Sequence, residues 1–225
     1  IFFSKQTMQA DSFPDPKLFA FLEKMSVKES DAQTSLRHQV EHLELATLQI
    51  SPLQGQLLKF LIKFQQPKLC LELGTYCGYS SLTIAEALPT SAHLHTCDVN
   101  IRTTQFAKNI WQEAGVANKI TLHLQPALKT LLNFSRTHLS TFDCIFIDAD
   151  KTQYPTYYLL AKDLLRSGGM MIIDNITWQG QIHNNEIQHR QINGIRRCNE
   201  IIQHDKDVIS CIIPLGDGMF LIQKV

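Results

Sequence analysis

Short apolar runs alternate with segments of helical periodicity along most of the chain after residue 67. Apolar runs bounded by turn residues are typical of buried strands, and strands that alternate with helices indicate βαβ units and a parallel sheet. The pattern therefore predicts an α/β protein. The predicted strands are Leu69–Leu73, Ala92–Asp98, Ile120–Leu124, Phe142–Asp148, Met170–Asp174, Val208–Pro214 and Met219–Gln223, and the predicted helices between them are Ser80–Ala87, Thr103–Ala114, Ala127–Phe134, Tyr154–Leu165 and Arg190–His204.

The two ends of the chain carry patterns of their own. The turn sequence 215–218, Leu-Gly-Asp-Gly, joins the last two predicted strands and predicts an antiparallel hairpin. Before residue 67, Ser35–Gln49 and Pro52–Phe64 have apolar residues at helical spacing, and Ser51 followed by Pro52 suits the start of a helix. We therefore expect residues 1–66 to form a helical N-terminal extension that packs on the sheet, within a single domain of residues 1–225.

The composition is that of a globular protein with balanced charge. Of its 225 residues, 44% are hydrophobic and 19% charged, and 21 Lys and Arg residues face 21 Asp and Glu residues. This balance gives no electrostatic drive toward a polyanion, so neither nucleic acid nor an anionic membrane is expected as a partner. No apolar run approaches the roughly 18–20 residues that span a bilayer, and the first residues lack the pattern of a signal peptide.

None of the six cysteines belongs to a Cys-x-x-Cys motif. Four of them, Cys70, Cys97, Cys144 and Cys211, lie in apolar runs that are predicted to be strands. Buried free thiols in a protein of the reducing cytoplasm are the favoured interpretation, and a disulfide or a zinc site is the alternative.

The first predicted strand leads into a turn with two glycines that opens a helix. Glu72 lies near the end of this strand, and Gly74 and Gly78 lie in the turn. In a doubly wound sheet, ligands bind outside the carboxyl ends of the strands, where glycines let the backbone approach them closely. Asp98 ends the second predicted strand, where an acid can accept hydrogen bonds from both hydroxyls of a ribose.

The spacing of the glycines separates two classes of cofactor. A dinucleotide site has Gly-x-Gly-x-x-Gly, because the pyrophosphate sits on backbone amides at a helix N-terminus. This chain has Gly-x-x-x-Gly, and the anionic Glu72 is a poor neighbour for a pyrophosphate. The pattern favours S-adenosylmethionine, which carries an ammonium and a sulfonium and no phosphate. NAD and a merely structural glycine turn are the alternatives.

Oxygen-bearing side chains end the fourth and fifth predicted strands. Asp148 ends the fourth, and Asp174 with Asn175 ends the fifth. Adjacent strands of a parallel sheet bring these ends together, and three oxygen ligands without a nearby cysteine suit a hard cation such as Mg²⁺, Mn²⁺ or Ca²⁺. The alternative is that each acid caps a helix or forms a turn.

The neighbouring residues suit a catalytic site. Beside a dication the ammonium form of Lys151 is disfavoured, so Lys151 is a candidate general base, with a solvated surface lysine as the alternative. Asp150 is expected either to face the cofactor or to cap the following turn. Tyr154 and Trp178 flank the site and are candidate walls for an aromatic substrate, although packing explains them equally well.

In their order along the chain, these motifs resemble the cation-dependent O-methyltransferases. This family of class I S-adenosylmethionine-dependent methyltransferases includes caffeoyl-CoA O-methyltransferase and, more distantly, catechol O-methyltransferase. The resemblance extends from about Leu43 to Val225, most of the chain. Its further markers are Gln49–Pro52, Gly55 with Gln56, Ala114–Val116, Gln125–Leu128, Gly180 and Pro214–Gly218. Each motif alone is modest, but the ordered set is specific.

The resemblance implies a Rossmann-like doubly wound sheet of seven strands, mostly parallel with an antiparallel last strand, and a homodimer. It implies that Asp148, Asp174 and Asn175 bind the metal, and that Lys151 and Asp148 belong to the catalytic site. The residues implied to line the cofactor are Ile50, Glu72, Gly74, Thr75, Tyr79, Ser80, Asp98, Ala127, Asp148 and Asp150.

Candidate substrate contacts in this comparison are Lys151, Trp178 and Gln179. The chain departs from the family at two positions. Leu48 stands where a Met is common, and Gln179 stands where plant members carry an Asn that touches the substrate. The second departure argues against caffeoyl-CoA itself as the substrate.

The predicted function is divalent-metal-dependent transfer of a methyl group from S-adenosylmethionine to a hydroxyl of a catechol-like phenolic small molecule. S-adenosylhomocysteine is the expected product, and Mg²⁺ is the expected cation, with Mn²⁺ or Ca²⁺ as alternatives. Two other functions stay open, an NAD-dependent oxidoreductase of the same sheet architecture and a non-enzymatic methyltransferase-like protein that binds cofactor or a partner chain. The complete set of acid, lysine and amide residues argues against the second.

Overall fold

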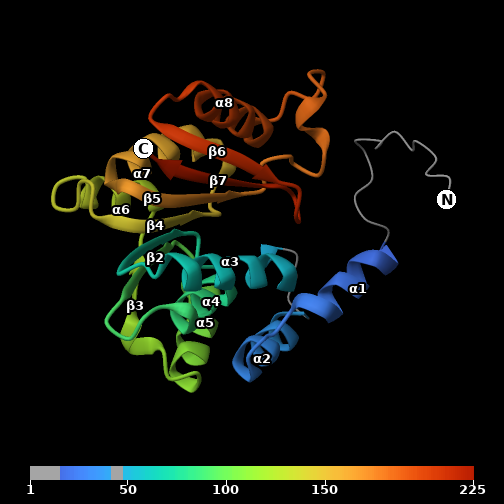
Figure 1. The fold of residues 1–225 in the computed structure, drawn as a ribbon, viewed down its shortest axis with the longest axis vertical. Helices are drawn as coiled ribbons and strands as arrows, with labels where there is room; N and C mark the ends of the chain where they lie inside the picture. The colour runs from blue at the N-terminus through green and yellow to red at the C-terminus, as the bar shows by residue number, and fades with distance from the viewer. Residues whose placement is uncertain (1–15, 42–47) are drawn as a thin grey trace, which may run out of the picture.

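The computed structural model describes residues 16–41 and 48–225 and contains a seven-stranded sheet in the order β3-β2-β1-β4-β5-β7-β6 (Figure 1). The strands β1 to β5 pair in parallel, and β7 runs antiparallel to both β5 and β6. Their bounds are β1 Leu69–Leu73, β2 His93–Asp98, β3 Ile120–Leu124, β4 Phe142–Ile147, β5 Leu165–Asp174, β6 Val208–Ile213 and β7 Met219–Lys224. The predicted α/β class, the reversed last strand and the hairpin are confirmed.

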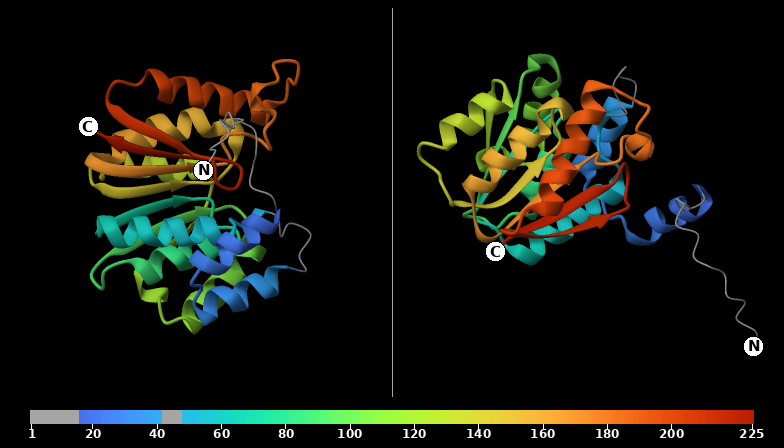
Figure 2. Two further views of the ribbon diagram at one scale, coloured as in Figure 1. Left: turned by 45° about the vertical axis from the view of Figure 1, so that its right-hand side comes forward. Right: turned by 90° about the horizontal axis from the view of Figure 1, so that it is seen from above.

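Helices cover both faces of the sheet, as the two views of Figure 2 show. One core joins one face of the sheet to α2, α3, α4 and α5, and a second core joins the other face to α6, α7 and α8. The helices are α1 Pro16–Ser26, α2 Asp31–Val40, α3 Pro52–Gln65, α4 Tyr79–Ala87, α5 Ile101–Glu113, α6 Ala127–Phe134, α7 Tyr154–Leu164 and α8 Arg190–His204, with short 3-10 turns at η2 Ala117–Lys119, η3 Lys151–Gln153 and η4 Gln181–His183.

The central strands are apolar on both sides because both faces are covered. In β1, Cys70 contributes to the core under α4, while Leu71 and Leu73 contribute to the core under α7. Burial of apolar area at roughly 25 cal/mol per Å² is the main favourable contribution to such a fold. The sheet is thereby fixed from both sides, and its strand ends are held in register.

Most predicted elements have bounds within two residues of those in the structure, and two differ by more. The helix predicted at Ser35–Gln49 is wrong at its start, since α2 begins at Asp31, where Ser30 and Gln33 form a capping box. It is also wrong at its end, since α2 stops at Val40 and Leu48–Ile50 are not α-helical, while residues 42–47 lie outside the described ranges. Strand β5 begins at Leu165, five residues before the predicted start, because Leu165 pairs with Phe142 of β4.

All six cysteines lie in the described ranges and are free thiols. Five are buried, as predicted, but the prediction is wrong for Cys211, which is exposed because it lies in the edge strand β6, where residues 209–212 are all exposed. Across residues 16–41 and 48–225, none of the helices combines the length and the apolar character needed to cross a bilayer. The assignment of residues 1–225 to a single domain stays a prediction.

Candidate functional site

A cavity of about 1010 Å³ opens where β1, β2, β4 and β5 end. Pockets for drug-sized ligands measure about 300–1,000 Å³, so this cavity has room for a cofactor together with a small substrate. Most site residues predicted from the sequence line it: Ile50, Gly74, Thr75, Tyr79, Ser80, Asp98, Ala127, Asp148, Asp150, Lys151, Asp174, Asn175, Trp178 and Gln179. Glu72, Gly78 and Tyr154 do not. Tyr154 is 1% exposed and its hydroxyl donates to the backbone carbonyl of Asp174 at 3.0 Å, so packing rather than access to the cavity accounts for it. The structure thus brings most of the predicted set together, while the role of each residue stays a prediction.

The turn between β1 and α4 packs tightly against the end of β4. Gly74 has a φ of 98°, and a Cβ atom at this position would overlap the carbonyl oxygen of Asp148. The backbone N–H of Asp148 donates to the carbonyl of Leu73 at 2.8 Å. Gly74 therefore allows the turn to approach the strand end that carries Asp148, in a backbone conformation that favours glycine.

Asp98 bridges the first two strand ends. One of its carboxylate oxygens accepts the backbone N–H groups of Thr75 at 3.1 Å and Tyr76 at 2.8 Å, and the other accepts that of Asn100 at 2.8 Å. These bonds fix the carboxylate at the cavity wall. A carboxylate held there has the position expected for binding sugar hydroxyls.

Glu72 is buried behind the cavity wall. Its carboxyl group accepts hydrogen bonds from Ser80 Oγ and Thr96 Oγ1, each at 2.5 Å. Burial raises the pKa of Glu72 to about 8, the charges of Asp148 and Asp98 add to this, and the two hydroxyl donors oppose it. Since Ser80 lines the cavity and Glu72 does not, the structure shows Glu72 as a support for Ser80.

Two acids meet at the ends of β4 and β5. Ile147 pairs with Ile173, so Asp148 and Asp174 follow paired positions on adjacent strands. Lys151 Nζ lies 2.6 Å from Asp148 Oδ1 and 5.5 Å from the centroid of the Tyr154 ring. The predicted base and the predicted metal ligand are therefore in direct contact.

Asp174 is 2% exposed and accepts a hydrogen bond from Gln54 Nε2 at 2.8 Å. Burial, followed by the negative charge of Asp148, raises the pKa of Asp174 to about 7, although the Asn175 backbone, Lys151 and Gln54 act in the opposite direction. Above this pKa, two carboxylates face one ammonium, and this wall of the cavity has an excess of negative charge. Such a group of oxygens is suited to a hard dication.

No group of three or more His, Cys, Asp or Glu side chains within residues 16–41 and 48–225 is arranged to hold a metal ion. The set predicted from the sequence is of another kind, because it combines two carboxylates with the amide of Asn175. Oxygen donors of this type suit Mg²⁺, Mn²⁺ or Ca²⁺ rather than a metal that prefers nitrogen or sulfur. The residues present therefore fit a hard cation by their chemistry.

The loop after β5 is held by Asp217 from the β6–β7 turn. One carboxylate oxygen of Asp217 accepts Thr177 Oγ1 at 2.6 Å and the Gln179 backbone N–H at 2.5 Å. Asn175, Trp178 and Gln179 all have positive φ angles, between 48° and 56°, which non-glycine residues adopt rarely and mostly where the surrounding structure enforces it. The hydrogen bonds to Asp217 thus fix the backbone that carries the candidate substrate contacts.

Asp150 caps the following turn, and its role toward the cofactor stays a prediction. It lines the cavity, and its side chain also accepts hydrogen bonds from the backbone N–H and the hydroxyl of Thr152 at the start of η3. Trp178 likewise lines the cavity and stacks on His189, with ring centroids 6.0 Å apart. In both cases packing or capping coexists with access to the cavity.

Sequence reasoning missed Gln54 and Asp217. Gln54 is the third residue of α3, and the capping box with Ser51 is visible as Ser-x-x-Gln in the sequence. That signal predicts a helix start, but it gives no hint that the amide also reaches Asp174, 120 residues away. For Asp217, the sequence signal predicts only the turn 215–218 and not the contact with the loop after β5.

Comparisons with known proteins agree with this site. Residues 23–225 match a family model described as O-methyltransferase. The chain is 34% identical over 212 residues to the mouse catechol O-methyltransferase domain-containing protein 1, covering 94% of this chain and 81% of that protein. It is 30% identical over 232 residues to a caffeoyl-CoA O-methyltransferase from Petroselinum crispum, covering 98% and 94%.

Among solved structures, the O-methyltransferase TomG from Streptomyces achromogenes, determined in complex with S-adenosylmethionine, has a TM-score of 0.86 and 29% identity to this chain. The match covers 93% of this chain and 96% of TomG. The predicted Rossmann-like architecture is therefore shared with an enzyme that binds the predicted cofactor.

Proposed function

This chain belongs to the O-methyltransferase family and acts as an S-adenosylmethionine-dependent O-methyltransferase, and we propose that it methylates a hydroxyl of a small vicinal diphenol with the help of a divalent cation. Membership of this family is the evidence for the methyl-transfer activity. Metal dependence and the class of acceptor are the proposed part. The alternative of an NAD-dependent oxidoreductase finds no support in the comparisons, since the relatives are named as methyltransferases.

The observation that carries the proposal is the meeting of Asp148, Asp174 and Lys151 on one wall of the cavity. Asp148 and Asp174 place two carboxylates beside the single ammonium of Lys151, and all three side chains are less than a fifth exposed. Asp148, Asp174 and Asn175 would hold the cation. A bound dication would offset the two carboxylate charges, disfavour the neighbouring ammonium and favour the ionised form of an acceptor hydroxyl.

The protein's own groups would perform the remaining steps. Lys151 Nζ would take the proton of the acceptor hydroxyl as general base. The wall that contains Gly74, Ser80 and Asp98 would hold the methyl donor, and Trp178 and Gln179 would flank the acceptor. The new carbon–oxygen bond forms as the carbon–sulfur bond breaks, and the electron pair of that bond stays on sulfur. Alignment of oxygen, carbon and sulfur can contribute about 7–11 kcal/mol to such a reaction.

Three features of the chain and its relatives support a vicinal diphenol as the acceptor. Two relatives are named for caffeoyl-CoA and for catechol, and the caffeoyl group carries a catechol ring. The cavity has aromatic residues at its wall, Tyr157 and Trp178. Gln179 differs from the plant pattern, so we propose a small diphenol rather than the coenzyme A ester. The homodimer that the family resemblance implies stays a prediction, which sedimentation would test.

The test is a methyl-transfer assay with labelled S-adenosylmethionine over a panel of vicinal diphenols, each paired with the corresponding monophenol. We expect methylation of diphenols only, its loss in EDTA and its recovery when Mg²⁺, Mn²⁺ or Ca²⁺ is added in excess. Asp174→Asn should abolish the response to metal, while Asp163→Asn on the exposed side of α7 should not. Full activity in EDTA would reject the metal, and equal turnover of monophenols would reject the acceptor class.

A further inference from the structure

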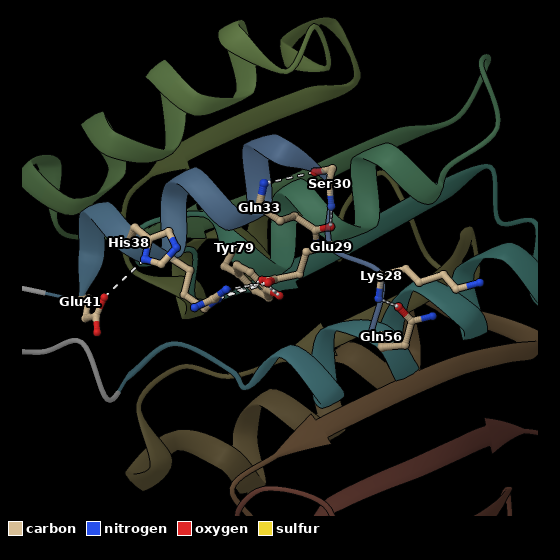
Figure 3. A network of polar contacts seen from close by, with 9 residues as sticks. Lys28, Glu29, Ser30, Gln33, His38, Glu41, Gln56 and Tyr79 are labelled. Carbon is tan, nitrogen blue, oxygen red and sulfur yellow. Dashed lines mark hydrogen bonds and ion pairs between the residues drawn. The ribbon is translucent and has the colours of Figure 1, made fainter. Parts of the chain in front are cut away.

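Helix α4 is bonded along one side to the α2 segment, by which we mean residues 27–41. Tyr79, Thr83 and Glu86 follow one another at helical spacing on α4, and each has a hydrogen-bond partner in the α2 segment. Gln33 Nε2 donates to Thr83 Oγ1 at 2.7 Å, and Ser30 Oγ donates to Glu86 Oε1 at 2.7 Å. The third contact, at the cavity end of α4, involves Glu29 and Tyr79 (Figure 3).

Glu29 connects the two helices through a charged group. Its Oε1 atom accepts the Tyr79 hydroxyl at 2.8 Å. Arg37, two turns along α2, donates from Nε at 3.2 Å and from Nη2 at 2.9 Å to the same carboxylate. The Glu29 side chain is 11% exposed. Its charge is therefore paired, and the carboxylate is fixed where it meets the tyrosine.

Tyr79 is held from two sides. It is the first residue of α4, it is 2% exposed, and it lines the cavity. A Cβ atom at Gly55 in α3 would come within 2.8 Å of the ring atom Cε1, so the ring lies directly on the backbone of α3. The hydrogen bond from the Tyr79 hydroxyl to Glu29 holds the tyrosine side chain from the other side.

The first turn of α4 is also the wall of the cofactor site. Gly78, with a φ of 90°, precedes Tyr79, and Ser80, which donates to the buried Glu72, follows it. A shift of Tyr79 would move both neighbours, and a misplacement of about 1 Å can cost about 100-fold in catalysis. The outer contact with Glu29 and the inner wall of the cavity thus belong to one rigid turn.

We propose that Glu29 is a positioning residue of the cofactor site, which acts through the Tyr79 hydroxyl and couples the docking of the α2 segment to the binding of S-adenosylmethionine. The proposal rests on the proposed function, because it takes the wall around Gly74, Tyr79 and Ser80 as the cofactor site. Coupling of this kind is reciprocal. An ordered α2 segment tightens cofactor binding, and bound cofactor in turn stabilises the α2 segment.

A purely structural role for the α2 segment makes a different prediction. Leu36 and Val40 are buried against the core, so α2 would contribute to stability even without the contact to Tyr79. In that case the loss of Glu29 would lower the unfolding temperature and leave the cofactor affinity of the folded protein unchanged. Affinity and stability therefore separate the two roles.

The first experiment measures the affinity of the full chain for S-adenosylhomocysteine by calorimetry, in the wild type and in Glu29→Ala, Glu29→Gln, Tyr79→Phe and the double variant Glu29→Ala with Tyr79→Phe. We expect Glu29→Ala and Tyr79→Phe each to weaken binding about tenfold, or about 1.4 kcal/mol. The double variant should be no weaker than either single one, because both remove the same contact. Glu29→Gln keeps an acceptor for the hydroxyl and should restore most of the affinity.

The matched control is Glu86→Ala, which breaks the bond to Ser30 at the end of α4 remote from the cavity. It should leave the dissociation constant within about twofold of wild type. Additive effects of Glu29→Ala and Tyr79→Phe, or unchanged affinity in both, would overturn the inference. Failure of the wild type to bind S-adenosylhomocysteine would overturn the cofactor assignment itself, which is a separate result.

A second experiment needs no variant. Hydrogen exchange of the backbone amides of residues 31–40 should slow when S-adenosylhomocysteine binds to the wild-type chain, because the coupling acts in both directions. In Glu29→Ala this protection should be lost. If exchange in α2 is the same with and without S-adenosylhomocysteine bound, the α2 segment and the cofactor site are not coupled.

Discussion

A Cβ atom at Gly194 in α8 would overlap the carbonyl oxygen of Lys151, so the glycine lets α8 pack directly on the turn that carries this lysine. The same Cβ atom would lie 2.9 Å from Cα of Thr152, the next residue of η3. The candidate base is thus supported from behind by a helix that contributes no side chain to the cavity wall.

Gly194→Ala is therefore expected to reduce kcat by displacing Lys151, by about 10- to 100-fold. In a helix interior, alanine is more favourable than glycine by about 1 kcal/mol. The higher helix propensity of alanine therefore partly offsets the loss of stability that the overlap causes. Steady-state kinetics at saturating cofactor measures the effect. Arg197→Ala, at an exposed position of the same helix, serves as the control and should keep wild-type kcat. An unchanged kcat in Gly194→Ala would show that the turn can adjust.

Lys151→Met should lower kcat by about 10²- to 10⁴-fold if Lys151 is the general base. The pH–rate profile should also change its shape, because the variant lacks the group that takes the proton of the acceptor hydroxyl. Lys162→Met is the matched control. Lys162 lies on α7, forms a 2.7 Å ion pair with Asp205 and does not line the cavity. A profile that keeps its shape in Lys151→Met would remove this residue from the proton transfer.

Gln54→Ala is expected to raise the metal concentration needed for half-maximal activity. Gln54 orients Asp174 through a 2.8 Å hydrogen bond, and groups that orient a metal ligand typically affect affinity about 10- to 100-fold. A titration of methyl transfer with Mg²⁺ gives the value. Gln56→Ala, which affects a bond to the Lys28 backbone instead, should leave the titration unchanged. Equal titrations for both variants would contradict the orienting role.

Asp143 should stabilise the fold at neutral pH and lose this effect in acid. Burial alone would raise the pKa of Asp143, but hydrogen bonds from Arg166 and from the Leu69 and Lys68 backbones outweigh it and hold the pKa below its ordinary value. The stabilisation is complete above the ordinary carboxyl range and disappears as pH falls through the lowered pKa. Asp143→Asn should therefore lower the free energy of unfolding by about 1–3 kcal/mol at pH 7.

Urea unfolding between pH 2 and 7 checks this prediction, with the gap between wild type and Asp143→Asn narrowing as the pH falls. Asp207→Asn is the contrast, since Asp207 is 73% exposed and its ion pair with Lys162 should contribute about 0–1 kcal/mol. A gap that stays constant down to pH 2 would mean that the charge of Asp143 is not the source of its effect.

The strands were predictable because their signal is local. The runs Leu69–Leu73 and Ile120–Leu124 have the same bounds in the structure, since turn residues such as Gly74 and Pro126 follow them closely and mark where each strand ends. The early start of β5 depends on the pairing of Leu165 with Phe142, which its own sequence does not reveal. Likewise, the turn at 215–218 indicates that β6 and β7 pair, but it does not say which of them pairs with β5.

The same difference between local signals and long-range contacts applies to the candidate site. Asp148 and Asp174 could be placed together because parallel strands end at one edge of the sheet. Glu72 was expected in the cavity wall, but the alternation of side chains along β1 turns it toward Ser80 and Thr96. Gln54, Asp217 and Gly194 come from elements whose position beside the strand ends follows only from the packing of helices and turns.

The place of β7 between β5 and β6 has a consequence for synthesis on the ribosome. A nascent chain that has emerged only as far as residue 213 has its first five strands available, yet β5 still presents an unpaired edge and β6 has no neighbour. Open strand edges are templates for intermolecular pairing. We therefore expect the growing polypeptide to be prone to intermolecular strand pairing until residues 219–224 insert and join the two parts of the sheet.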